Sequence, residues 1–336
     1  MSLPPRPVRR LVLAPTVFLV SAISLLLLPL WLLVAAFASR FVPGRWRILR
    51  LTWFFAVYLA FEALMLIALL GLWIGSGFGQ KLGTPAFETR HYRLMGWFLR
   101  RVVGNARRTF GVRIEREDSL DQKLVKHEHP FLIFSRHAGP GDSFLLVEDV
   151  LNNLKLRPRI VLKDTLQLDP AIDIVLNRLP NRFVPSTGRA GDKVVQGIGE
   201  LATSMTAGDA LILFPEGGNF TPGRRERAIA HLEKVERPDL AERARELQHV
   251  LPPKPTGALT AIEAAPTADI ILVGHAGLEQ MSTLGDLWRG LPMDAGVSMR
   301  RWRIPVGDLP DPSEREAWLY DAWELIDSWI DERLNH

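Results

Sequence analysis

Cysteine is absent from the 336 residues of this chain. Its absence excludes disulfide bonds, thiolate metal sites and a cysteine nucleophile, and it leaves the redox compartment open. Internal repeats and low-complexity tracts are missing too. The formal net charge is only +4. Such a mild basic excess suits anionic membranes, acidic substrates and nucleic acid equally, so charge alone selects no partner.

Charge is also missing from residues 11–39, and residues 51–74 contain one acidic residue, Glu62, and no basic one. Both runs exceed the roughly 20 apolar residues that a membrane-spanning helix needs. Pro15 and Pro29 are expected to bend the first run. We therefore predict a two-helix membrane module in residues 1–80, in the cytoplasmic membrane, with the rest of the chain facing the cytoplasm. A cleaved signal peptide is the competing interpretation, but its apolar segment usually has roughly 7–15 residues.

The orientation of this module is open. Arginines precede the first run, lie between the runs and follow the second. A hairpin of two spanning helices would place the arginines of the linker outside the cell, against the tendency of basic loops to stay inside. The alternative places both helices in one leaflet, with every basic end at the cytoplasmic face. The sequence allows both arrangements.

Residues 81–110 combine apolar residues at helical spacings with many arginines. The apolar positions are Phe87, His91, Leu94, Met95, Phe98, Leu99 and Val102. Six arginines lie mostly at other positions of the same stretch. An apolar stripe beside arginines is typical of a helix that lies on anionic headgroups, so we predict a basic interfacial helix here. A helix that packs on the following domain is the alternative.

The pattern changes after residue 110. Short β-branched or apolar runs then alternate with helical stretches, which predicts an α/β domain over residues 111–336, with a mostly parallel sheet covered by helices. The strand-like runs are residues 111–115, 130–134, 158–163, 181–185, 209–214, 268–273 and 297–304. Helices are expected over residues 191–208, 224–248 and 313–334. The second of these is charged nearly all round and is expected to be a solvated surface. The tryptophans of the third are expected to pack on the body or to touch the membrane.

Two of the strand-like runs end in loops that carry ionisable groups among small residues. His137 and Asp142 follow the run 131–134, and "FPEG" (Phe214–Gly217) follows the run 209–213. In parallel sheets, ligands bind beyond the carboxyl ends of the strands, so the two loops are candidates for one site. A histidine removes a proton near neutral pH when a carboxylate fixes its tautomer and its ring. The Gly-Pro-Gly turn between His137 and Asp142 allows the two side chains to fold back onto each other.

Two other interpretations of this loop stay open. His137 is then an ordinary turn residue and Asp142 a helix cap. Alternatively, Ser143 in "GDSF" is the nucleophile of a GDSL-type ester hydrolase. That arrangement needs an Asp and a His three residues apart near the C-terminus, whereas Asp331 and His336 are five apart. It also leaves His137 without a role.

The order of the motifs resembles a known family. An H-x₄-D motif, then "FPEG" about eighty residues later, then "LPPKPTGALTAI" (Leu251–Ile262), is similar to the 1-acylglycerol-3-phosphate acyltransferase family, a group of glycerolipid acyltransferases. Within that family, "LPPKPTGALTAI" and "VSMRRWRIPVGDLP" (Val297–Pro310) resemble the lysocardiolipin and lysophosphatidylinositol acyltransferase branch in particular. The resemblance covers roughly residues 111–310. It implies that an acyl group moves from acyl-CoA or acyl-carrier protein to the hydroxyl of a lysophospholipid such as lysophosphatidic acid.

The resemblance also implies roles for single residues. His137 would be the general base and Asp142 its orienting partner. The residues implied to hold the phosphate-bearing acceptor are Phe214, Pro215, Glu216 and Gly217. No metal and no other cofactor is implied, the membrane partner is anionic, and nucleic acid is not expected. A catalytically silent lipid-binding or scaffold protein of the same fold is the chief alternative.

Three positions depart from the family pattern. Arg136 stands where Asn usually precedes the histidine, Gly218 stands where Thr or Ser usually follows "FPEG", and Ser186 stands at the place of a phosphate-binding arginine. The residues expected to take over phosphate binding are Arg189, Arg182 and Lys163. Acceptor specificity is the property that these departures leave open.

Overall fold

The computed structural model describes residues 3–117, 128–139, 141–184, 191–278, 284–293 and 296–335. The chain forms two compact units. The first unit contains residues 1–112, 159–190 and 291–294, and the second contains residues 113–158, 191–290 and 295–336. This division differs from the predicted boundaries 1–80, 81–110 and 111–336. Part of the predicted α/β domain packs with the N-terminal helices instead.

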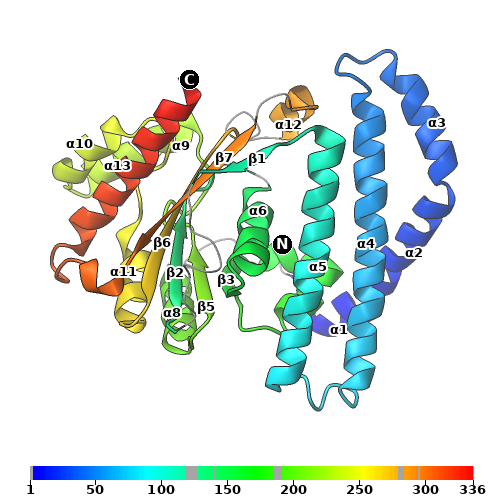
Figure 1. The fold of residues 1–336 in the computed structure, drawn as a ribbon, viewed down its shortest axis with the longest axis horizontal. Coiled ribbons are helices and arrows are strands. Elements are labelled where there is room, and N and C mark those ends of the chain that lie inside the picture. The colour runs from blue at the N-terminus through cyan, green and yellow to red at the C-terminus, as the bar shows by residue number, and fades with distance from the viewer. Residues whose placement is uncertain are drawn as a thin grey trace. The chain divides into compact units, whose positions relative to one another are not determined.

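Helices make up most of the first unit (Figure 1). They are α1 (Arg6–Val8), a wider turn over Arg9–Leu13, α2 (Ala14–Leu26), α3 (Leu28–Ser39), α4 (Arg47–Gly75), α5 (Pro85–Phe110) and α7 (Pro170–Leu176). The predicted bend at Pro29 is confirmed, because the first apolar run breaks at Leu27. Two helical stretches, Arg6–Leu26 and Arg47–Gly75, are long and apolar enough to cross a membrane by length and composition.

Helix α5 packs along α4, and α2 and α3 pack on α4 as well (Figure 1). The apolar stripe predicted on α5 is buried, including Phe87, Met95 and Leu99. Its six arginines are exposed. Protein therefore covers the stripe, and only the arginine-bearing side of α5 is accessible. Contact of this helix with anionic headgroups stays a prediction.

The short helix α7 explains why residues 159–190 belong to the first unit. Arg9 forms a salt bridge of 2.8 Å with Asp173 of α7, and both side chains are buried. Arg178, just after α7, donates a hydrogen bond of 2.9 Å to the carbonyl of Leu69 in α4. In the same unit, β3 (Arg157–Lys163) pairs in parallel with β4 (Arg182–Val184).

A mostly parallel sheet forms the centre of the second unit, as the sequence predicted. Its strands lie in the order β1 (Ile114–Arg116), β7 (Val297–Ile304), β6 (Asp269–Ala276), β2 (Phe131–Ser135) and β5 (Asp209–Leu213). Only the pair of β6 and β7 is antiparallel among these described strands. Every residue of β2, β5 and β6 is buried. These three strands are the core of the unit.

Helices cover both faces of this sheet, with α11 and α13 on one face and α6 on the other (Figure 1). The helices of the unit are α6 (Asp142–Glu148), which runs on as a wider turn over Asp149–Asn153, α8 (Gly191–Thr203), α9 (Pro222–Lys234), α10 (Pro238–Glu246), α11 (Pro255–Ala264), α12 (Leu284–Gly290) and α13 (Arg315–Leu334). Helix α13 places Trp323 and Trp329 in the core, so these two tryptophans pack on the body.

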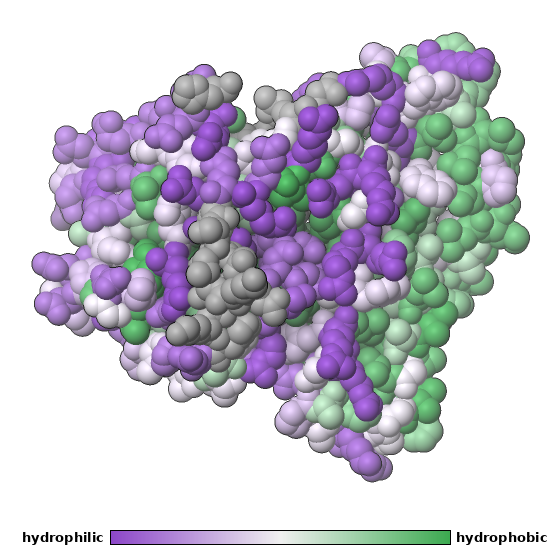
Figure 2. Space-filling view, viewed as in Figure 1, coloured by the Kyte–Doolittle hydropathy of each residue, from purple (hydrophilic) through white to green (hydrophobic). Residues whose placement is uncertain are grey.

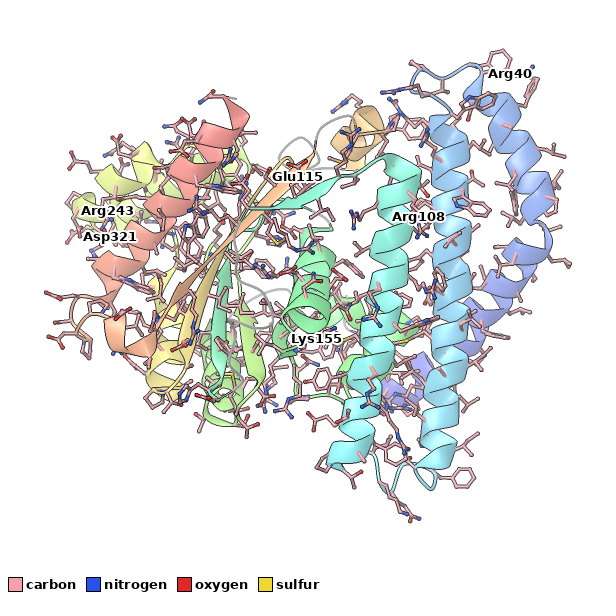
Figure 3. The ribbon with its side chains drawn as sticks, viewed as in Figure 1. Arg40, Arg108, Glu115, Lys155, Arg243 and Asp321 are labelled. Atoms are coloured by element: carbon pink, nitrogen blue, oxygen red, sulfur yellow. The ribbon has the colours of Figure 1, made fainter. Side chains whose placement is uncertain are left out.

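The single charged helix expected over residues 224–248 is two helices, α9 and α10. Pro238 lacks the N–H that a continuous helix needs, and Glu236 adopts a positive φ of 58° just before it. The expectation of a fully solvated surface is also wrong for α10, because Leu240, Ala241 and Ala244 are buried. Its outer side is charged: Arg243 meets Asp321 of α13 at 2.5 Å (Figure 3).

Candidate active site

His137 lies just beyond the carboxyl end of β2, and Asp142 begins α6. The structure brings the two side chains together: His137 Nδ1 lies 2.7 Å from Asp142 Oδ2. The same carboxylate oxygen accepts hydrogen bonds from the backbone N–H of Ala138, at 2.8 Å, and of Gly139, at 3.2 Å. The loop therefore wraps around the Asp142 carboxylate and presents the imidazole beside it.

The contact with Asp142 decides the tautomer of His137. A carboxylate only accepts, so Nδ1 carries the proton and Nε2 has a free lone pair. The side chain of His137 is 22% exposed, whereas that of Asp142 is 1% exposed. Burial alone would raise the pKa of Asp142, but the hydrogen bond from His137 and the charge of His275 lower it below its usual range. The site thus pairs an accessible histidine with a buried, charged carboxylate.

The backbone of His137 is held on both sides by the "FPEG" loop and the residues after it. Its N–H donates to Glu216 Oε1 at 3.0 Å, and its carbonyl accepts from the N–H of Phe220 at 2.7 Å. The ring of Phe214 packs on the imidazole, with 4.6 Å between ring centroids. These contacts follow from the parallel pairing of β2 with β5, which ends both strands at one edge of the sheet. The predicted meeting of the two loops is confirmed.

Glu216 is buried at the junction of three loops. Besides the His137 N–H, its carboxylate accepts the N–H of Leu251 at 3.0 Å, and Lys254 N–H donates to the carbonyl of Pro215 at 2.9 Å. The proline-containing loop after Leu251 is therefore fastened to the "FPEG" loop. Burial raises the pKa of Glu216 to about 8, although the charge of Arg136 and the two N–H groups oppose the shift. Substrate binding by Glu216 stays a prediction, and backbone donors occupy both of its oxygens.

Arg136 and His275 complete the surroundings of the dyad. From the sequence, Arg136 is only a departure from the family pattern, and His275, which follows a strand-like run, is expected either to flank the site or to be a core residue. Arg136 is fully buried and donates to the carbonyls of His275, at 2.6 Å, and His249, at 2.7 Å. His275 lies near the end of β6, with Nε2 3.8 Å from Asp142 Oδ2. One signal was available: a charged residue directly after an apolar central strand is unusual enough to mark a site.

The remaining candidates for phosphate binding lie outside the second unit or outside the described residues. Arg189 and Ser186 lie outside the described residues. Lys163 ends β3 and Arg182 begins β4, and both are exposed in the first unit. Phosphate binding by these three basic residues stays a prediction. Gly217 lies in the "FPEG" loop with a positive φ of 69°.

The geometry around Ser143 does not support the hydrolase interpretation. The Ser143 hydroxyl donates to Asp142 Oδ1 at 3.2 Å, and it makes no hydrogen bond with a histidine among the described residues. Asp331 pairs instead with His249, at 3.0 Å, and His336 lies outside the described residues. Within the described part of the chain, no group of three His, Asp or Glu side chains has the arrangement that holds a metal ion.

Comparisons with known proteins leave the family open. No protein-family model matches the sequence, and no curated protein does. Among solved structures, the chain is similar to the crystal structure of the 1-acyl-sn-glycerophosphate (LPA) acyltransferase, PlsC, from Thermotoga maritima. The two share 14% sequence identity with a TM-score of 0.48, over 85% of this chain and 98% of that one. A likeness at this level carries no functional argument, so a functional assignment has to rest on the geometry around His137.

Proposed function

We propose that this chain is a membrane-associated O-acyltransferase. It moves a fatty acyl group from acyl-CoA or an acyl-carrier protein to the hydroxyl of a lysophospholipid. The observation that carries the proposal is the 2.7 Å contact between His137 Nδ1 and Asp142, with Nε2 left to accept a proton. The resemblance of the H-x₄-D and "FPEG" motifs to glycerolipid acyltransferases supports the same reaction.

The dyad has no nucleophile of its own, so the substrate supplies it. His137 Nε2 takes the proton of the acceptor hydroxyl, and the Asp142 carboxylate stabilises the imidazolium that forms. The alkoxide then adds to the thioester carbonyl. When the tetrahedral intermediate collapses, the C–S bond breaks and the imidazolium returns the proton to the thiolate. The amides of Ala138 and Gly139 donate to Asp142, so oxyanion donors come from other groups.

The surface of the first unit supports the membrane assignment. Apolar residues gather over α2, α3 and α4 (Figure 2). Large side chains are exposed there, among them Leu19, Leu33, Phe37, Phe55 and Ile67. An exposed apolar surface of this kind marks a contact with lipid or protein.

The contacts at the two ends of α4 favour one of the orientations that the sequence left open. At its start, Arg47 Nε donates to the carbonyl of Leu291 at 2.8 Å, and near its end the carbonyl of Leu69 accepts from Arg178. Both partners lie outside the apolar helices but within the same unit. Polar contacts at both ends support a helix that lies along the membrane surface. We therefore include in the proposal that α2–α4 enter one leaflet only.

The test measures thiol release from acyl-CoA by the purified full chain, with and without lysophosphatidic acid. Release should require the acceptor. His137→Ala should lower turnover at least about 10²-fold, the usual contribution of a general base, and Asp142→Asn should be similarly damaging. Ser143→Ala, the matched control in the same loop, should change turnover little.

Two results would replace the proposal. If Ser143→Ala abolished activity and His137→Ala did not, the chain would be an ester hydrolase. If the protein bound lysophospholipid but released no thiol with any acyl-CoA or acyl-carrier protein, it would be a lipid-binding protein.

A further inference from the structure

Besides the His137–Asp142 dyad, the second unit contains a cavity of about 690 Å³ beside the "FPEG" loop. Its wall includes Glu216, Gly217 and Gly218, and its apolar lining includes Leu232 and Leu240. We call it the basic cavity, after the basic side chains that line it: Arg224, Arg227, His231 and Lys254. The volume is in the usual range for small-molecule sites, roughly 300–1,000 Å³.

Three basic side chains of this cavity have no partner among the described residues. The side chains of Arg227, His231 and Lys254 form no hydrogen bond or ion pair with another described residue. Glu316, an acidic residue on the wall, is paired with Arg237 at 2.8 Å. All three side chains are exposed, so water screens their charges, and an anionic ligand that contacts several of them at once would replace that water.

The glycines of the loop make room for two of these cations. A Cβ atom at Gly217 would lie 2.8 Å from Lys254 Nζ, and one at Gly218 would lie 3.3 Å from Arg224 Nη1. Lys254 and Arg224 therefore lie directly against the main chain of the loop that holds His137. Gly218 is also the position where the chain departs from the acyltransferase pattern. The glycine leaves room for the Arg224 side chain, which a Cβ atom at this position would crowd.

The cations form a row along one side of α9. Arg224, Arg227 and His231 are spaced by three and four residues, which places them on one face of the helix. From Arg224 to His231 the helix rises about 10 Å. A single phosphate contacts only part of such a row. Arginine and lysine both bind phosphate, the former through two parallel hydrogen bonds.

We propose that the basic cavity binds an extended anion with more than one phosphate group. The identity of its source rests on the proposed function. Within an acyl transfer, such an anion is the phosphorylated nucleotide of the coenzyme A donor or the headgroup of an acceptor with two phosphates. Glu216 lines the cavity and accepts the N–H of His137, so the bound anion lies next to the loop that carries the base.

The experiment measures equilibrium binding to the full chain in detergent by calorimetry. One arm uses coenzyme A and adenosine 3′,5′-bisphosphate, and the other uses monolysocardiolipin. Glycerol 3-phosphate and inorganic phosphate serve as probes with one phosphate. Arg227→Ala and Lys254→Ala should each raise the Kd of one arm about tenfold, the lower range for a lost charged hydrogen bond. Lys234→Ala removes the same charge from α9 outside the cavity and should leave Kd unchanged.

The two arms assign the source, since only the ligand that occupies the cavity should respond to both variants. The inference is overturned if neither arm binds more tightly than inorganic phosphate, or if the Arg227→Ala/Lys254→Ala double variant binds as the unaltered chain does. Binding is measured without turnover, which separates the two hypotheses. A chain that binds but transfers no acyl group refutes the proposed function alone. A chain whose double variant transfers acyl groups with unchanged KM for both substrates refutes the inference alone.

Discussion

His137 is held by residues that lie far apart in the sequence. Asp142 fixes its ring nitrogen, Phe214 packs on the ring face, Glu216 binds its N–H, and Phe220 binds its carbonyl. Each contact restricts a rotation or movement that the His137 side chain or its loop would otherwise have to lose during the reaction. At the scale of single residues, the site is therefore preorganised for the proton transfer that we propose.

Glu216 should make the stability of the protein depend on pH. Its pKa in the folded state is about 8, against an ordinary value of 4.5. Between these values the folded chain keeps a proton that the unfolded chain releases. The stabilisation is complete below pH 4.5 and is lost as the pH rises to 8, by at most about 1.4 kcal/mol per pH unit. Glu216→Gln cannot titrate, so its free energy of unfolding should lack this decline.

Denaturant unfolding of both proteins between pH 5 and 9 checks this expectation. We subtract the free energy of unfolding of Glu216→Gln from that of the unaltered chain. This difference should fall steadily as the pH rises to about 8 and should then level off. Parallel curves over the whole range would mean that Glu216 titrates normally in the folded state.

Arg136 is expected to be a strong determinant of stability. Arg136→Met keeps the apolar stem but leaves the carbonyls of His275 and His249 without their donor. Unsatisfied buried groups cost about 1–3 kcal/mol each, so the free energy of unfolding should fall by about 2–4 kcal/mol. Arg93→Met, on the exposed side of α5, is the control. Equal effects of the two substitutions would show that the buried arginine contributes nothing specific.

At the scale of elements, the sequence pattern predicted where the strands lie but not how they pair. Each of the seven strand-like runs forms a strand, because apolar β-branched residues favour extended backbone wherever they lie. The direction of β7 against β6 was not predictable, since a run of residues carries no information about its neighbour. The burial of the α5 stripe was not predictable either, because lipid and a packed helix select the same apolar face.

In the site too, contacts within one loop were predictable from the sequence, and contacts between distant segments were not. His137 and Asp142 were predicted to meet because a short Gly-Pro-Gly turn joins them and because the order of the motifs resembles a known family. The contacts of Arg136 with His249 and His275 join segments more than 100 residues apart. Only the order of strands in the sheet creates them. No local pattern in the sequence encodes that order.

Helix α13 should stabilise the proline-containing loop. Asp327 accepts the N–H groups of Gln248, His249 and Val250, the residues directly before Leu251. Asp327→Ala removes these charge-assisted bonds and should lower the free energy of unfolding by about 2–4 kcal/mol.

The proposed acyl transfer should fall with Asp327→Ala as well, because Leu251 is tied to Glu216 and through it to His137. Glu332→Ala, at an exposed position of α13, serves as the control in thermal unfolding and thiol release. If both variants matched the unaltered chain, the loop would be held by other contacts.

At the scale of the whole molecule, the first unit presents an apolar face and a basic one. The apolar face lies over α2–α4, and the basic one is the exposed arginine side of α5 (Figure 2). Such a pair suits a protein that enters one leaflet and contacts its headgroups.

The absence of cysteine makes this orientation measurable. Arg40→Cys, at the end of α3 (Figure 3), and Lys81→Cys, after α4, each introduce the only thiol of the chain, at an exposed position. In sealed inside-out membrane vesicles, a maleimide that cannot cross the bilayer should label both variants if α2–α4 enter the cytoplasmic leaflet only, as proposed. Labelling of only one variant would show that α4 spans the bilayer.

The order in which the chain is synthesised has a consequence for the first unit. Its parts are residues 1–112, 159–190 and 291–294, and the last part closes on the first through the bond from Met293 N–H to the carbonyl of Phe110. Residues translated early therefore wait for partners that leave the ribosome near the end of synthesis. During that interval Arg9 has no Asp173 to neutralise it. The N-terminal helices emerge with their apolar side chains exposed, and the finished fold leaves part of that surface exposed as well. Contact with a bilayer or a chaperone should therefore protect the nascent chain from aggregation throughout synthesis.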